Sequence, residues 1–565
     1  MVDNVLLEKL RKVYSEKFDL PYKEIPQKAE DYMAKRITAY LNLIQTLANE
    51  KFEALKNNFE DKKNEIFDYF EMLPDTSSLK KDFKNVINQN IDEVKLWLGN
   101  NLSMGSIDVN IMTKVDKENY KNGEKLPQEF NDAHAALRGY ANSNLTSSLV
   151  LSAGMSPRLY AYIENFEDFY PDASGSIKKK IVLKVSDYRS ALIQGKFLAK
   201  KGLWVSEYRI ESGLNCGGHA FATDGFLMGP ILDEFRNNKE TLIADVFGIL
   251  TKALENKGKP VPETLMPVKV TAQGGVGTTE EHEFLLDYYQ VDSVGWGSPF
   301  LLVPEATTVD DYTLKELAKS KEEDLYLSDI SPLGVPFNSL RTASATLKKI
   351  EKVKKGRPGS SCPKAYLVSN AEYTDRPICT ASRQYQYLKL KELETQNLPE
   401  SAYQKAVDKI TAPECLCVGL SEPAILTHHI DYKIKDNGVT VCPGPNIAYF
   451  DKIVSLKNMV GHIYGKTDLL RKAYRPHMFV KELNLYIDYL KKQVEETTDK
   501  IDKKQAKYFQ KFTTNLEEGI DYYKSLFGKK TAKFAASGQE ILSDLDRSKQ
   551  KLIKLFKKIE MFSLE

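Results

Sequence analysis

The sequence predicts an α/β protein with a central parallel sheet and with mostly helical regions at both ends of the chain. Between about residues 105 and 350, short β-rich runs end in glycine or small polar residues and lead into helical segments. The runs 180–186 and 203–210 are separated by an apolar stripe at helical spacing over residues 188–199. A strand, a helix and a further strand in this order imply parallel pairing. Repeated units of this kind form either a doubly wound sheet or a (β/α)₈ barrel.

Each expected strand is a short run rich in β-branched and aromatic residues and bounded by turn residues. The predicted strands are 107–115, 147–153, 180–186, 203–210, 268–273 and 292–297. The helix between the third and fourth strands is predicted from Tyr188, Ala191, Leu192, Gly195, Leu198 and Ala199.

Both ends of the chain carry apolar residues at helical spacings among many charges, which predicts amphipathic helices. The N-terminal stripe is Ile44, Ala48, Phe52, Leu55 and Phe59. The C-terminal stripes are Leu483, Ile487, Leu490, Val494 and Ile501, then Leu516, Ile520, Tyr523 and Phe527. Because no proline interrupts the C-terminal stretch, its helices are expected to be long. They either cover the rest of the protein or pair two subunits into a homodimer.

These patterns divide the chain into four regions, in keeping with a length of 565 residues at about 100–200 residues per domain. Residues 1–104 form a helical N-terminal region, and residues 105–350 form the α/β region. Residues 351–478 are an extension that holds five of the six cysteines. Residues 479–565 form the long C-terminal helices.

The composition excludes several classes of protein. Lys and Arg number 80 against 78 Asp and Glu, so the chain lacks the basic excess of a nucleic-acid-binding protein. No run approaches the roughly 18 apolar residues that span a bilayer, so no membrane partner is expected. The N-terminal segment is charged throughout and does not resemble a secretory signal. With six cysteines, too few for a disulfide scaffold, the sequence predicts a cytoplasmic protein with reduced thiols.

Glycines gather directly after two successive strands. Three of them follow the strand 268–273 and precede a helix that begins at Thr278 or Thr279. Glycine lets the backbone approach an anion closely, and a helix N-terminus adds partial positive charge. A second group follows the strand 292–297, and two such turns predict a phosphate site, with simple tight turns as the alternative. The residues of this predicted phosphate site are Gly274, Gly275, Gly277, Gly295, Gly297 and Ser298.

The loop after the strand 203–210 concentrates polar side chains. A neutral imidazole at His219 is suited to accept a proton near pH 7. A single histidine after a strand is more often structural, but in combination with the predicted phosphate site His219 becomes the candidate base. Cys216 is interpreted as a small buried residue, because no activating partner for its thiol is evident in the sequence. The loop carries Glu211, Gly213, Asn215, Cys216, Gly217, Gly218 and His219.

These segments resemble the nitronate monooxygenase (2-nitropropane dioxygenase) family, which includes FMN-dependent enoyl-ACP reductases. The resemblance runs from about Ile107 to Arg341. VKVTAQGGVGTTEEHEFLLDYYQVDSVGWGSPF is similar to the strand–Gly-Gly–helix–strand–Gly phosphate site of the family. The stretch from KIVLKVS to NCGGHAF resembles its Gly-Gly-His segment, and IDVNIM resembles its Gly-Val-Asn strand. Residues 1–104 lack the opening strands of the family, and residues 351–565 have no counterpart in a minimal member.

The resemblance implies an FMN-binding (β/α)₈ barrel over residues 105–350. It implies an FMN-dependent oxidoreductase acting on a small organic molecule, with His219 as proton acceptor or donor and flavin N5 as the hydride site. It places Asn110 against the flavin. The complete predicted cofactor site is Asn110, Lys184, Glu211, Gly217, Gly218, Gln273, Gly274, Gly275, Gly277, Gly295, Gly297 and Ser298.

The cysteines of the extension suggest a second chemistry. Four thiolates are able to hold a [4Fe–4S] cluster or zinc, and a cluster would suit electron delivery to a flavin. Their spacing matches no usual C-x₂-C pattern, so reduced core cysteines are the alternative. The candidate ligands are Cys362, Cys379, Cys415 and Cys417, with Cys442 further along the chain.

Two other functions remain open at this stage. The phosphate site suits equally well a barrel enzyme without redox chemistry, an isomerase or lyase that binds a phosphorylated metabolite. A third hypothesis is a non-catalytic assembly module that acts through the long helices.

Overall fold

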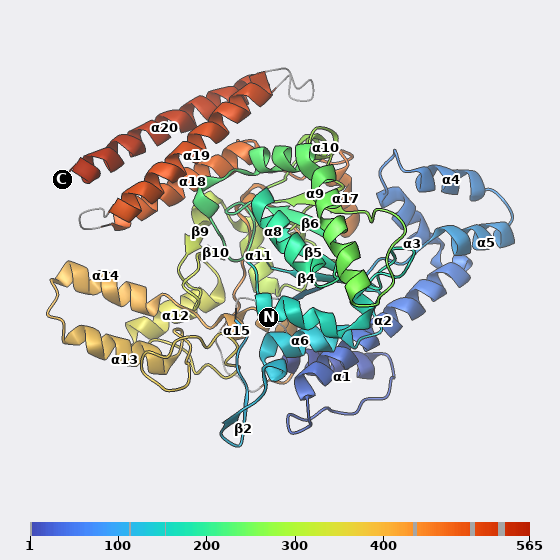
Figure 1. Ribbon diagram of the computed structural model, residues 1–565, viewed down its shortest axis with the longest axis horizontal. Helices are drawn as coiled ribbons and strands as arrows, with labels where there is room; N and C mark the ends of the chain where they lie inside the picture. The colour runs from blue at the N-terminus through green and yellow to red at the C-terminus, as the bar shows by residue number, and fades with distance from the viewer. Residues whose placement is uncertain are drawn as a thin grey trace.

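The computed structural model describes residues 3–111, 115–152, 154–432, 438–497, 503–528 and 537–564 (Figure 1). This part of the chain folds around a parallel sheet of six strands in the order β1-β4-β5-β6-β7-β8. The predicted α/β class with a parallel sheet is therefore confirmed. The strands are β1 Val109–Ile111, β4 Ser147–Leu151, β5 Lys179–Val185, β6 Val205–Glu211, β7 Lys269–Gln273 and β8 Ser293–Gly295.

All six predicted strands are present, each within a few residues of its expected bounds. The first is the least complete, because only β1 forms within the predicted run 107–115, of which residues 112–114 lie outside the described residues. Residue 153, at the end of the second predicted strand, also lies outside them. The helix predicted from the stripe between the third and fourth strands is α8, Tyr188–Ala199.

The six strands occur in the sheet in the same order as along the chain. A doubly wound sheet reverses its strand order at a switch point, and this sheet does not. Because parallel crossovers are almost always right-handed, an order without reversal puts the connecting helices on one face. Because all neighbouring strands are parallel, the carboxyl ends of all six strands lie at one edge of the sheet. The backbone hydrogen bonds of the described residues define these six strands and not a closed ring of eight.

Helices connect the strands and bury their apolar sides against the sheet. α8 and α9 pack on each other, and Ala191, Leu198 and Val246 lie in the main hydrophobic core. The connecting helices are α6 Asp132–Ala141, α7 Pro157–Tyr162, α8, α9 Met228–Asn256 and α10 Thr279–Asp287.

The N-terminal region is helical, as predicted, and it packs in two places. Ile37 and Leu41 of the second helix join the main core, whereas Ile66, Phe70 and Leu98 belong to a separate small core. The predicted apolar stripe spans a helix boundary, since α2 ends at Asn57 and α3 begins at Phe59. The helices are α1 Asn4–Lys17, α2 Tyr32–Asn57, α3 Phe59–Met72, α4 Ser78–Val86 and α5 Ile91–Asn101.

Two antiparallel hairpins were not predicted. The larger, β9 Leu325–Ser328 with β10 Phe337–Leu340, follows the sheet and helix α11, Asp311–Lys319. The smaller pairs β2 Tyr120–Lys121 with β3 Glu124–Lys125. Strands this short carry too few residues for a period of two to stand out in the sequence.

Beyond the hairpin the chain forms the helices of the cysteine-containing extension. α13 and α14 pack on each other as an antiparallel pair that projects away from the sheet in Figure 1. The helices are α12 Ser344–Lys354, α13 Arg383–Glu394, α14 Glu400–Thr411, α15 Leu416–Gly419, α16 Glu422–Thr427 and α17 Leu456–Ile463.

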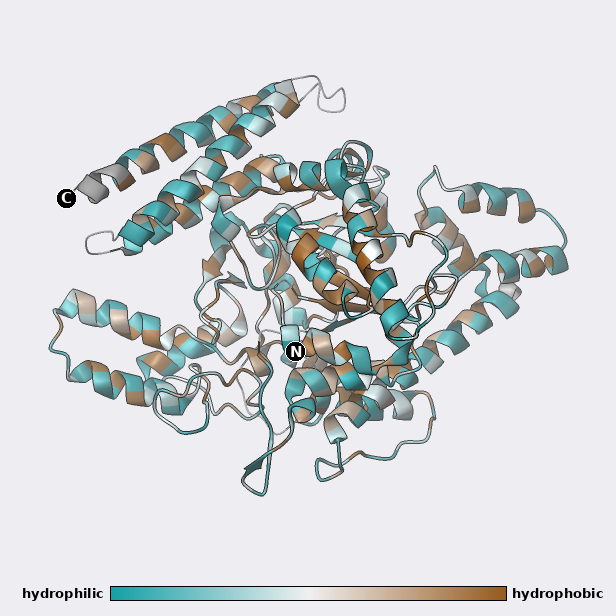
Figure 2. Cartoon of the chain, viewed as in Figure 1, coloured by the Kyte–Doolittle hydropathy of each residue, from teal (hydrophilic) through white to brown (hydrophobic). Residues whose placement is uncertain are grey.

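The C-terminal region consists of α18 Met478–Glu496, α19 Lys503–Gly528 and α20 Gly538–Leu564. Its apolar stripes are buried in the same core cluster as residues of the sheet, so the helices cover the α/β region. Hydrophilic and hydrophobic residues alternate along α19 and α20, as expected for amphipathic helices (Figure 2). Ile501 of the predicted stripe lies outside the described residues. None of the described helices is both long enough and apolar enough to cross a membrane.

Candidate functional site

A cavity of about 420 Å³ lies at the edge of the sheet where the parallel strands end. Its walls come from β1, β5 and β6 and from the loops that follow β4 and β6. Polar side chains from segments far apart in the sequence therefore face one space. Six of the predicted site residues line it, namely Asn110, Lys184, Glu211, Gly217, Gly218 and His219.

A charged pair lies in the wall of this cavity. The Lys184 ammonium is 3.2 Å from a carboxylate oxygen of Glu211, on the neighbouring strand. The side-chain amide of Gln273, which is paired with Glu211 across β6 and β7, donates a hydrogen bond to the same carboxylate. Three predicted residues on three adjacent strands thus form one polar network. The network holds the Glu211 carboxylate in a fixed position at the cavity.

The hairpin β9–β10 positions His219. His219 Nε2 lies 2.7 Å from the Ser331 hydroxyl, and the ring packs edge-on against Phe337 with centroids 4.9 Å apart. The backbone of the histidine loop also pairs with β10, since the Asn338 N–H donates to the Gly218 carbonyl at 2.9 Å. The loop is therefore anchored by a hairpin that follows it by more than a hundred residues.

Cys216 lies in the same loop as His219, and its surroundings keep its thiol protonated. Burial, strengthened by the negative charge of Glu211, raises the pKa of its thiol well above the ordinary value. The thiol donates a weak hydrogen bond to the Gln273 carbonyl at 3.5 Å. A protonated thiol is a poor nucleophile. Cys216 is half-buried and lines the cavity, so it is less buried than the sequence interpretation expected.

The two glycine-rich turns lie side by side, because they follow the neighbouring strands β7 and β8. Gly274 and Gly275 have φ angles of 132° and 77°, in the region that favours glycine. A Cβ on Gly274 would lie 2.6 Å from the Cβ of Ser212, and one on Gly275 would overlap the Asn215 amide. Both glycines are therefore required by contacts within the protein itself.

The N-terminus of α10, predicted to face a phosphate, is occupied by a carboxylate of the same chain. Glu281 Oε2 accepts a hydrogen bond from the Gly277 N–H at 2.9 Å, and Oε1 accepts one from the Met478 N–H at 2.7 Å. The Arg475 guanidinium donates to both oxygens, at 2.7 and 2.8 Å. Burial is the largest single influence and opposes ionisation of Glu281. The charges of Arg475 and His477, together with hydrogen bonds from Arg475 and the Gly277 N–H, outweigh burial and hold the pKa of this carboxyl below its usual value.

Arg475 also closes the first glycine turn from outside. Its guanidinium donates to the Gly275 carbonyl at 2.7 Å and to the Asn446 side chain at 3.1 Å. Asn446 in turn donates to the Val276 carbonyl at 2.7 Å. Residues of the 351–478 extension therefore bind the turn that the sequence assigned to a phosphate.

The second turn is only partly engaged. The Ser298 hydroxyl accepts a hydrogen bond from the Gly444 N–H at 2.7 Å. At Gly297, by contrast, no heavy atom lies within 4 Å of the place that a Cβ would take. The predicted phosphate site is thus closed around residues 274–277 and has open space at Gly297.

An acidic residue that the sequence analysis missed lies next to the cavity. Glu482 of α18 accepts hydrogen bonds from the Ser212 hydroxyl at 2.5 Å and from the Met228 N–H at 3.0 Å. Ser212 itself lines the cavity. Burial raises the pKa of Glu482 to about 7, although hydrogen bonds from Ser212, Met228 and Tyr523 oppose this shift. The C-terminal region therefore supplies a titratable group at the cavity wall.

A signal for Glu482 is present in the sequence. It lies between Phe479 and Leu483, and one helical turn before Tyr486, on the apolar stripe that predicts α18. A charged residue on the buried face of an amphipathic helix needs a polar partner inside the protein. No comparable pattern points to Arg475, which lies in a segment without regular structure between α17 and α18.

The four predicted metal ligands are arranged as neighbouring thiols. The thiols of Cys362 and Cys379 are hydrogen bonded to each other, which lowers the pKa of Cys362 to about 7. Cys415 and Cys417 are buried in a small hydrophobic cluster. Among the described residues, no three His, Cys, Asp or Glu side chains are grouped as metal ligands. The expected [4Fe–4S] cluster or zinc at Cys362, Cys379, Cys415 and Cys417 gains no support from this part of the chain and stays a prediction.

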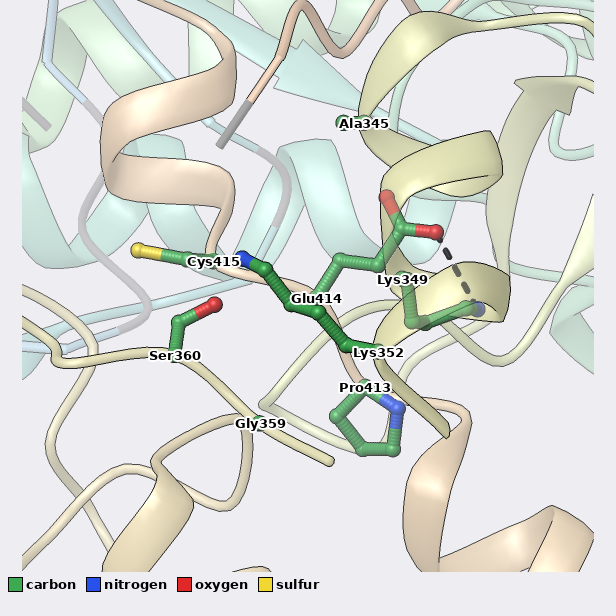
Figure 3. A pocket seen from close by; sticks show the side chains of 8 residues that line it. All are labelled: Ala345, Lys349, Lys352, Gly359, Ser360, Pro413, Glu414 and Cys415. Carbon is green, nitrogen blue, oxygen red and sulfur yellow. Dashed lines mark ion pairs between the residues drawn. The ribbon is translucent and has the colours of Figure 1, made fainter. Parts of the chain in front are cut away.

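A small second cavity lies between α12 and the segment before α15 (Figure 3). The Glu414 side chain is only 4% exposed and pairs with Lys349 at 3.1 Å. The space beside them is about 20 Å³, enough for about one water molecule. It contains one predicted site residue, Cys415, and is too small for a cofactor.

Comparisons with known proteins add little. No family model matches the chain, and no curated protein matches it. Among solved structures, the chain is similar to the enoyl reductase domain of MlnA from the macrolactin biosynthesis cluster of Bacillus amyloliquefaciens. The two are 14% identical, with a TM-score of 0.33, over 79% of this chain and 88% of that chain. A similarity at this level carries no argument about function.

Proposed function

We propose that the protein is an FMN-dependent oxidoreductase of the nitronate monooxygenase type, with its site in the cavity at the carboxyl ends of the strands. The observation that carries this proposal is the convergence of Asn110, Lys184, Glu211 and His219 on one cavity. The sequence resemblance assigns all four of these residues to one site.

The proposal includes a barrel-like arrangement of the sheet. Six parallel strands in chain order are the arrangement expected of part of a (β/α)₈ barrel, in which the crossovers share one hand and the helices lie outside. In such barrels the active site forms at the carboxyl ends of the strands. The cavity lies at this edge. Most of the residues that line it lie at the ends of the strands or in the loops that follow them.

The residues present fit a flavin in two respects. The cavity, about 420 Å³, is within the usual range for cofactor sites, about 300–1,000 Å³. Polar groups of Asn110, Lys184 and Glu211 face it. The exposed turn at Gly297 does not line this cavity, but the open space there leaves room for a phosphate. The N-terminus of α10 does not fit, because Glu281 occupies it. We therefore assign the phosphate to the turn at Gly297 and not to the helix N-terminus.

When bound, FMN supplies a hydride acceptor or donor. His219, held through Nε2 by Ser331, would accept a proton from the substrate or return one to it. The Lys184–Glu211 pair would present fixed charges beside the reacting group without needing to reorient. Phe337 keeps the imidazole ring in place.

FMN binding and His219→Ala test the proposal together. Purified protein incubated with FMN and then desalted should be yellow, with quenched flavin fluorescence. His219→Ala should keep the flavin and lose about 10²–10⁴-fold in turnover with a nitronate or an enoyl substrate, the range for general acid–base catalysis. Gly297→Ala, whose Cβ meets no protein atom within 4 Å, should fold normally and bind FMN more weakly. Protein that stays colourless after incubation would remove the assignment.

A further inference from the structure

Two cysteines of the extension lie in contact with each other. The thiols of Cys362 and Cys379 share a hydrogen bond. They differ in access, since Cys362 is half-buried and Cys379 is only 3% exposed. Both belong to the long connection between α12 and α13. An oxidant from solvent therefore reaches Cys362 more easily than Cys379.

Backbone pairing on both sides holds the two thiols together. Ser360 forms a bridge with Ser382, through hydrogen bonds of 3.0 Å to the Ala381 carbonyl and 2.8 Å from the Arg383 N–H. On the other side, the Ile378 N–H donates to the Asn370 carbonyl at 2.7 Å. Two bridges that flank the cysteines leave little freedom for the thiols to separate. A disulfide forms only between cysteines that lie close together.

We propose that Cys362 and Cys379 form a reversible disulfide when the protein meets hydrogen peroxide or an organic hydroperoxide. The Cys362 sulfur attacks one peroxide oxygen, the O–O bond breaks, and water or an alcohol leaves, so that Cys362 becomes a sulfenic acid. The Cys379 sulfur then attacks the Cys362 sulfur, the S–O bond breaks and a second water leaves. Two thiols are oxidised, and one peroxide is reduced. A thiol reductant such as glutathione or dithiothreitol reverses the reaction.

The neighbouring thiols are less suited to this reaction. Cys415 and Cys417 are 8% and 3% exposed and pack among apolar side chains such as Leu416 and Val418. An oxidant reaches them less easily than the half-buried Cys362. We therefore expect Cys362 to form its disulfide with Cys379 and not with Cys415 or Cys417.

The pair also lies close to the support of His219. Thr380, the residue after Cys379, donates its hydroxyl to the Pro332 carbonyl at 3.0 Å. The preceding residue, Ser331, contacts His219 at 2.7 Å. A disulfide at Cys362–Cys379 would thus act on the segment that positions the candidate base. Its formation does not depend on the proposed function.

Peptide mapping of the full chain tests the proposal. Purified protein is treated with hydrogen peroxide, alkylated under denaturing conditions and cut with trypsin. Cleavage after Lys364 separates the two cysteines, because Arg357 and Arg376 each precede a proline. The expected product is peptide 356–364 linked to peptide 365–383, with a mass lower by two hydrogen atoms than the sum of the two. Dithiothreitol should return both peptides to the alkylated, unlinked form.

Cys362→Ser should abolish the linked product, whereas Cys442→Ser, which changes another half-buried cysteine, should leave it unchanged. The six free thiols of the wild type should fall by two after oxidation. Linkage through Cys415 or Cys417 would overturn the proposal. So would oxidation of Cys362 without any link to Cys379. Co-purified zinc or iron that protects these cysteines from peroxide would also overturn it. The wild-type map gives a result even if a variant fails to fold.

Discussion

The edge of the sheet where the strands end has an open half at β1, β5 and β6 and a closed half at β7. In the open half, Lys184, Glu211 and His219 border a cavity of about 420 Å³. In the closed half, the first glycine turn is covered by Arg475 and its helix N-terminus is taken by Glu281. Both halves carry many glycines and polar residues, and their sequences gave no reason to expect this difference.

A sequence places several glycines in one turn for either of two physical reasons. Glycine is needed where a ligand approaches the backbone, and equally where another part of the chain does. At Gly275 the approaching group is Asn215 of the same protein, whereas the space beside Gly297 is empty. Only the second situation leaves room for an external anion. The following substitutions test this contrast, beginning with the largest expected effect.

Arg475→Ala should destabilise the closed half most strongly. Its guanidinium and the Glu281 carboxylate are 9% and 2% exposed, so removing the cation leaves a buried charge without its partner. Breaking a buried pair in this way costs about 3–5 kcal/mol. Urea denaturation should therefore show a much lower midpoint than that of the wild type.

Lys492→Ala is the matched control for this prediction. The Lys492–Asp329 pair is 3.2 Å long but 41% and 64% exposed, and exposed pairs contribute about 0–1 kcal/mol. If Arg475→Ala unfolds at the same urea concentration as Lys492→Ala, the Glu281–Arg475 contact does not hold the turn closed.

Glu482→Gln should change how stability depends on pH. The pKa of Glu482 is about 7 in the folded protein against an ordinary value of 4.5, mainly because of burial. With a raised folded-state pKa, the carboxyl stabilises the fold fully below about pH 4.5, and this contribution is lost as the pH rises toward about 7. The loss is on the order of 3 kcal/mol. Urea midpoints near about pH 5 and about pH 8 should therefore differ less for Glu482→Gln than for the wild type.

The other titratable groups near Glu482 do not contribute to this pH dependence of stability. Tyr486 of the same helix, Tyr523 of α19 and Cys216 of the histidine loop all have pKa values raised well above their ordinary ones, chiefly by burial. They therefore stay neutral between about pH 5 and pH 8. An equal pH dependence in variant and wild type would show that Glu482 is ionised throughout this range.

Local patterns in the sequence predicted much of the fold. The strand runs and the stripe of α8 were correct because β-branched runs and helical periodicity reflect contacts between near neighbours. The hairpin β9–β10 was missed because its two strands are too short to show a hydrophobic period. Which residues pair between the strands cannot be found from such a period either. The hydrogen bonds of the described residues join six strands and do not show the predicted closed ring of eight. Closure of a barrel depends on pairing between strands that are far apart in the sequence, which local patterns do not reveal.

The candidate site divides in the same way. Asn110, Lys184 and His219 were placed in one site by motif, and they line one cavity. Arg475 and Glu482 were missed, because each acts through contacts nearly two hundred residues or more away along the chain. A single sequence contains the residue types of such contacts but not their pairing.

The smallest predicted effects separate the two glycine turns directly. Gly275→Ala should destabilise the protein by about 1–3 kcal/mol, because alanine at a φ of 77° is strained and its Cβ meets the Asn215 amide. Gly297→Ala has a φ of −106° and empty space for the Cβ, so its effect should stay within about 0.5 kcal/mol. Thermal unfolding of the two variants beside the wild type measures both. Equal destabilisation would mean that the Gly297 turn is as tightly packed as the Gly275 turn, which would leave no room there for an external phosphate.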